Sequence, residues 1–126
     1  MKLSDLNPHN VKTDAEIDTN LKILLERLQT LETEYVKSGG LPFHVNSGLR
    51  SLEQQMKINP AAMHSKHLTG AAADIGDSDS KLYTCVIDNM PVVEAIGFWM
   101  EDKAHTPTWL HFQTQPPKSG HRWFIP

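Results

Sequence analysis

Cysteine is almost absent from the 126-residue chain. Cys85 stands alone, which excludes a disulfide within the chain and removes the usual sign of folding in an oxidising compartment. No apolar run approaches the roughly 20 residues that span a bilayer, so we expect no membrane span. Acidic residues outnumber basic ones 15 to 12, so nothing favours a nucleic-acid partner. Residues 1–6 lack the apolar segment of a secretion signal, which predicts cytoplasmic synthesis without a signal peptide.

The composition is otherwise that of an ordinary globular protein, with 39% hydrophobic and 21% charged residues. A chain of this length has room for one core, so we expect residues 1–126 to form a single domain. Seven histidines are many for such a chain. Their number raises the expectation of a metal site without locating it.

The N-terminal third is predicted to be an extended arm over residues 1–12 and a long amphipathic helix over about 13–37. Pro8 interrupts any helix in the arm, and Thr13 with Glu16 matches a capping box. Apolar residues then recur at three-and-four spacing over five turns. That stripe could form a coiled-coil seam, but we expect it to pack on the domain's own sheet, because so short a chain needs it for the core.

The remaining chain alternates between short strands and short helices, with the catalytic core expected over residues 43–113. The pattern predicts strands over residues 41–47, 71–75, 98–101, 109–113 and, at a sheet edge, 122–125. It predicts helices over residues 52–57, 81–89 and 91–96. This order favours an α+β fold with a small antiparallel sheet, packed by the long N-terminal helix and the shorter helices.

The most informative stretch is Ser-Lys-His-Leu-Thr-Gly-Ala-Ala-Ala-Asp over residues 65–74. It places His67 and Asp74 seven positions apart, with small residues between them that let the backbone pack closely. Strand alternation puts His111 on a polar face with Trp109 and Gln113. Zinc hydrolases usually use three such ligands and keep a fourth position for water. We therefore predict a zinc site made by His67, Asp74 and His111 on the sheet.

These motifs resemble those of the zinc D-alanyl-D-alanine carboxypeptidase family, which includes vancomycin-resistance D,D-dipeptidases and phage endolysins. The resemblance lies in the segments Ser65-x-His67-x-x-Gly70-x-Ala72-x-Asp74 and Trp109-x-His111. Residues 47–51 are similar to the family's Ser-Gly-aromatic-Arg-Ser segment, with Leu49 in place of the aromatic residue. The compact chain is most similar to phage-type single-domain members.

The resemblance implies zinc as cofactor, held by His67, Asp74 and His111. It also implies that Arg50 binds the carboxylate or carbonyl of the substrate, a role that a planar, always charged guanidinium suits. The expected activity is hydrolysis of peptidoglycan peptides, as a D,D-carboxypeptidase or an L,D-endopeptidase. The implied setting is a phage or prophage wall hydrolase, acting as a virion component or with lysis-system proteins.

The sequence does not decide which residue acts as the general base of the expected reaction. Several relatives carry an acid three positions before the last histidine, where this chain has Thr108. Glu101 and His105 are the candidates, with Asp102 a third. We favour Glu101, because a carboxylate suits proton transfer from metal-bound water and its strand could pair with that of His111. Some relatives use a histidine near the last ligand, which supports His105.

Two other functions fit part of the pattern. The missing acid at Thr108 allows a non-catalytic zinc-containing module of the same fold that binds the cell wall or serves in a virion. Iron(II) oxygenases also use two histidines and a carboxylate. Their carboxylate usually follows the first histidine by two positions, whereas Asp74 follows His67 by seven.

Overall fold

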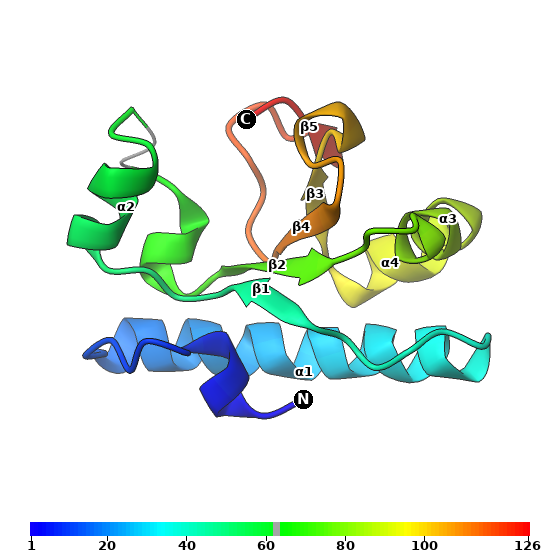
Figure 1. Ribbon diagram of the computed structural model, residues 1–126, viewed down its shortest axis with the longest axis horizontal. Helices are drawn as coiled ribbons and strands as arrows, with labels where there is room; N and C mark the ends of the chain where they lie inside the picture. The colour runs from blue at the N-terminus through cyan, green and yellow to red at the C-terminus, as the bar shows by residue number, and fades with distance from the viewer. Residues whose placement is uncertain (62–63) are drawn as a thin grey trace.

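The structure is a computed structural model that describes residues 1–61 and 64–126. In sequence order its α-helices and strands are α1 Ala15–Lys37, β1 Val45–Ser47, α2 Leu52–Ile58, β2 Ala72–Gly76, α3 Lys81–Asp88, α4 Met90–Ile96, β3 Trp99–Glu101, β4 Trp109–Gln113 and β5 Trp123–Phe124 (Figure 1). Three 3-10 turns join them: η1 Leu3–Leu6, η2 Lys66–Thr69 and η3 Lys103–His105. The α+β fold is confirmed. Among the described residues no helix is both long and apolar enough to cross a membrane.

The long helix α1 runs beneath the sheet and supplies one side of the core (Figure 1). Its N-cap lies one residue later than predicted, because the Asp14 carboxylate, and not the Thr13 hydroxyl, accepts a hydrogen bond from the Ile17 N–H at 2.8 Å. The apolar stripe is buried as expected, at Leu21, Leu24, Leu28 and Leu31. The stripe is therefore used for the domain's own core.

The N-terminal arm differs from the extended segment that the sequence predicts. Leu3–Leu6 forms the turn η1, and the Leu6 side chain is fully buried in the core. The Leu6 carbonyl accepts the Leu49 N–H at 2.8 Å, and a Cβ on Gly48 would collide with that carbonyl. Burial of a leucine side chain contributes about 1.5–3 kcal/mol, which favours a docked arm over a free one. The arm thus supports the segment around Gly48.

The sheet has the order β1-β2-β4-β3-β5. All neighbouring pairs of strands are antiparallel except β3 and β5, which are parallel. The sheet is therefore mixed, whereas the sequence predicts a wholly antiparallel one. The chain does reverse after β4, but β4 already has two neighbours. β5 therefore pairs at the free edge of β3, where its direction makes it parallel. The predicted edge strand is confirmed, though shortened to Trp123–Phe124.

The register between β2 and β4 places core side chains on one face of the sheet and polar side chains on the other. Ile75 and Leu110 are paired across β2 and β4 and are fully buried against the core. Asp74 and His111 are the next pair along the same strands. Because side chains alternate along a strand, these two lie on the other face of the sheet, away from α1. One face therefore stabilises the fold and the other presents the polar residues.

Candidate metal centre

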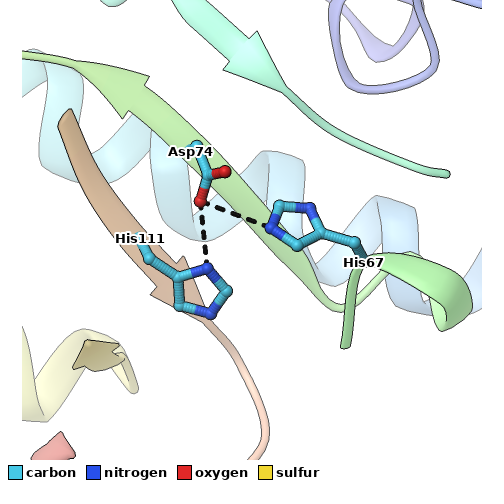
Figure 2. Close-up of side chains that lie close together, drawn as sticks. All are labelled: His67, Asp74 and His111. Atoms are coloured by element: carbon cyan, nitrogen blue, oxygen red, sulfur yellow. Dashed lines mark hydrogen bonds and ion pairs between the residues drawn. The ribbon is translucent and has the colours of Figure 1, made fainter. Parts of the chain in front are cut away.

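Three side chains from separate elements meet on this face of the sheet (Figure 2). Asp74 comes from β2, His111 from the paired position of β4, and His67 from η2. The small residues predicted to allow close packing do so: Gly70 has a left-handed backbone (φ 77°), and a Cβ there would meet Leu21 of α1. The turn that delivers His67 can therefore lie directly over α1.

The three predicted ligands are brought together. Asp74 Oδ1 lies 3.0 Å from His111 Nδ1 and 3.3 Å from His67 Nε2. One ligand atom from each residue lies within 4.8 Å of the other two. The residues are 3%, 8% and 3% exposed for His67, Asp74 and His111, so water competes little for these atoms. Two imidazole nitrogens and a carboxylate oxygen form a donor set typical of zinc.

The outer nitrogen of each imidazole is held by an acceptor. His67 Nδ1 donates to the Gly48 carbonyl at 2.9 Å. His111 Nε2 donates to Gln113 Oε1 at 2.8 Å, and the amide is oriented because Gln113 Nε2 donates to the Gln115 carbonyl. With protons on the outer nitrogens, each neutral imidazole turns the lone pair of its inner nitrogen toward Asp74, and only a doubly protonated ring can donate to that carboxylate. The space between the three atoms therefore suits a cation, either a proton or a metal ion.

Two of the separations can be compared with those around zinc. Ligands about 2.0–2.2 Å from a tetrahedral zinc lie roughly 3.3–3.6 Å apart. The 3.3 Å between Asp74 Oδ1 and His67 Nε2 falls in this range, whereas the 3.0 Å to His111 Nδ1 is a hydrogen-bond distance that a bound metal would lengthen slightly.

The electrostatics of the site also favour a cation. Burial would raise the pKa of Asp74, but hydrogen bonds from His111 and His67 outweigh burial and hold that pKa well below its usual range. Burial would lower the pKa of His111, but the hydrogen bond and charge of Asp74 raise it. The site attracts positive charge.

Arg50 lies behind Asp74 and contacts its second oxygen. Its Nη2 donates to Asp74 Oδ2 at 3.4 Å, Nε to Ser47 Oγ at 3.0 Å, and Nη1 to Gln55 Oε1 at 3.1 Å. Gln55 is 1% exposed, so this network is buried at its base. A guanidinium has five N–H groups, and the three bonds leave two for another acceptor. Arg50 orients Asp74 whether or not it also meets a substrate.

Glu101 and His105 lie in different surroundings. Glu101 Oε1 is 3.6 Å from His111 Nδ1, because β3 pairs with β4 as the sequence predicts. The His105 ring lies 3.3 Å from the Asp102 carboxylate, and both of these side chains are 46% exposed. The geometry brings Glu101 into the cluster, whereas His105 and Asp102 pair with each other at the surface of η3.

Two polar side chains beside the ligands support them in different ways. Gln113 holds His111, as its position on β4 suggests. Ser65 instead accepts the His67 N–H at 3.3 Å and caps η2. The backbone acceptor at Gly48 and the buried Gln55 were not predicted. A carbonyl carries no residue-specific signal, and Gln55 looks from the sequence like any polar helix residue.

One of the three comparisons with known proteins found a match. No curated protein and no solved structure matches the chain. The profile of the family described as Peptidase M15 matches residues 1–104, which include Arg50, His67, Asp74 and Glu101 but end before His111. The match covers most of the sequence, so the chain belongs to the Peptidase M15 family, a family of zinc-dependent peptidases.

Proposed function

We propose that this chain is a zinc metallopeptidase that hydrolyses peptidoglycan peptides. The observation that carries the proposal is the convergence of His67 Nε2, Asp74 Oδ1 and His111 Nδ1, with both outer ring nitrogens held by acceptors. Membership of a zinc peptidase family supports the same reaction class. When bound, zinc polarises the scissile carbonyl and makes its water acidic.

Proton transfer is assigned to Glu101. Its carboxylate is 21% exposed and lies 3.6 Å from a proposed ligand atom on His111, so a water molecule between substrate and site would be within its reach. Glu101 Oε1 would take the proton of the attacking water and pass it to the leaving amine. His105 is the weaker candidate, because its ring faces Asp102.

Arg50 is assigned a double role. Its bond to Asp74 Oδ2 fixes the carboxylate, and its two remaining N–H groups are available to a carbonyl or carboxylate of the peptide. The guanidinium side chain is 16% exposed, which leaves part of it open to a ligand. Substitution of Arg50 should therefore weaken both metal and peptide binding.

The bond cleaved is proposed to be of the D,D-carboxypeptidase or L,D-endopeptidase type. The biological setting is proposed to be a phage or prophage wall hydrolase, reaching the wall with a virion or after lysis-assisted release. Both rest on the sequence resemblance to compact phage-type members, whose motifs at Ser65–Asp74 and Trp109–His111 this chain shares.

The test is incubation of zinc-loaded protein with purified muropeptides, followed by mass spectrometry of the products. Loss of a terminal D-alanine would identify a carboxypeptidase, and cleavage within the stem would identify an endopeptidase. Retention of zinc and binding to peptidoglycan without any product would instead support the non-catalytic wall-binding module. Stoichiometric iron in place of zinc would support an oxygenase.

A further inference from the structure

A pocket of about 300 Å³ opens directly beside the candidate metal centre. Its inner wall includes Glu101 and His111, so anything bound there touches the proposed reacting groups. Its outer walls come from the segment before His67 and from the loop and edge strand that follow β4. Three hundred cubic ångströms is the lower end of the range for ligand sites, which suits one or two residues of a peptide.

Two lysines from separate segments of the chain line this pocket. Lys66 stands in η2, and Lys118 lies in the loop between β4 and β5. In the described part of the chain neither ammonium group lies within 4 Å of a carboxylate, whereas Lys103, for comparison, pairs with Asp77. Glu101 is the acidic side chain among the described residues of the lining, and Pro126 also lines the pocket. Two lysine side chains and one acidic side chain thus line this pocket, in a chain whose net charge is −3.

Apolar side chains form another part of the lining. Phe124 and Ile125 line the pocket, and Ile125 is 76% exposed. A peptide residue seated there would cover that side chain and gain burial energy while its charged group met the lysines. The combination of an apolar wall with two cations fits an amino-acid residue that carries a free carboxylate better than it fits a neutral or basic residue.

We infer that this pocket is the subsite for a carboxylate-bearing residue of the substrate peptide, with Lys66 and Lys118 binding the carboxylate. The inference rests on the proposed peptidase function and names the substrate class within it. Arg50 is not among the described residues that line this pocket, so the two lysines, and not Arg50, are placed to meet this carboxylate. The carboxylate can be the terminal one, in a carboxypeptidase, or that of an internal D-glutamyl residue, in an endopeptidase.

The experiment compares three peptides with the zinc-loaded full chain: L-Ala-γ-D-Glu-L-Lys-D-Ala-D-Ala, its C-terminal amide, and its D-isoglutamine form. The unmodified protein should discriminate against one of the two amides, and that amide identifies which carboxylate is bound. Lys66→Ala with Lys118→Ala should raise KM for the acidic peptide about tenfold, with kcat within about twofold, and should abolish the discrimination. Added salt should weaken the discrimination only in the unmodified protein.

The matched control is Lys22→Ala, an exposed lysine of α1 on the far side of the sheet, which should leave all three KM values unchanged. Equal KM values for acidic and amide peptides in the unmodified protein would overturn the subsite while leaving the peptidase function intact. A Lys66→Ala, Lys118→Ala double variant that still discriminates between the acidic peptide and its amide would overturn the subsite in the same way. Failure to cleave any of the peptides or muropeptides would overturn the proposed function, and the subsite with it.

Discussion

Asp74 is the residue on which the whole centre converges. Its Oδ1 meets His67 and His111, and its Oδ2 meets Arg50. A buried carboxylate is stable only when its charge is compensated, and here three neighbours compensate it. One imidazole from η2 and one from β4 can thus be held at the same oxygen, and each keeps its inner nitrogen free for a metal.

Glu101 is expected to be required for turnover but not for metal binding. Glu101→Gln keeps the shape and removes the base, so kcat should fall about 10²- to 10⁴-fold while zinc content stays near one per chain. His105→Gln is the matched control and should lower kcat by less than about threefold, because that ring pairs with Asp102 at the surface. The measurement is kcat on muropeptides with zinc determined on the same samples. A larger loss in His105→Gln would reverse the assignment.

At the scale of elements, the pairing of β2 with β4 aligns the two strand-borne ligands. Asp74 and His111 are 37 positions apart in sequence yet directly paired in the sheet. A register slip by one residue would turn one of them toward the core. The core residues that alternate with them therefore also fix the site, since Ile75 and Leu110 hold the register from the other face.

The docked N-terminal arm is expected to support the site through Gly48. Leu6→Ala should destabilise the protein by about 2–5 kcal/mol, because a fully buried leucine leaves a cavity. Leu3→Ala is the control, since Leu3 is 42% exposed, and its effect should stay within about 0.5 kcal/mol. Urea unfolding of the zinc-free variants measures both. Equal effects would show that the arm is not docked.

The helices and strands were largely predictable, because their signals are local. Ser51 and Gln54 form a capping box at the start of α2, and Gly97 ends α4, so the residues beside each helix mark its limits. The docking of Leu6 and the direction of β5 were missed, because each depends on which distant surface is free. The site was predictable from ligand chemistry and family resemblance. The two lysines of the pocket were not, since Lys66 and Lys118 lie far apart in the sequence.

At the scale of the whole molecule, charge and pH govern when the centre is filled. The pKa of His111 is raised in the folded protein, so without metal its pairing with Asp74 stabilises the folded state fully below about pH 6.5. This stabilisation is lost as the pH rises through the pKa that His111 has in the folded protein. The lowered pKa of Asp74 means that its contribution is present above about pH 4 and lost as pH falls further. The pair alone therefore favours a mildly acidic maximum of stability.

Bound zinc should prevent the loss of folding stability at alkaline pH. Zinc needs the inner nitrogen of His111 deprotonated, so it competes with the proton, and its stabilising effect should grow with pH. We expect the difference in Tm between zinc-loaded and chelator-treated protein to be larger at pH 8 than at pH 5.5. Thermal unfolding at matched ionic strength measures it. A difference that is constant or shrinks with pH would mean that zinc does not displace this proton.

The most direct test of the central claim is the metal content of the purified protein and of His111→Ala. We expect one zinc per chain in the unmodified protein, less than about a tenth of that in His111→Ala, and full zinc in the control His121→Ala, whose side chain is exposed at the surface. Inductively coupled plasma mass spectrometry on samples confirmed as folded by circular dichroism gives these values. Equal zinc in His111→Ala and the unmodified protein, or no zinc in either, would contradict the account.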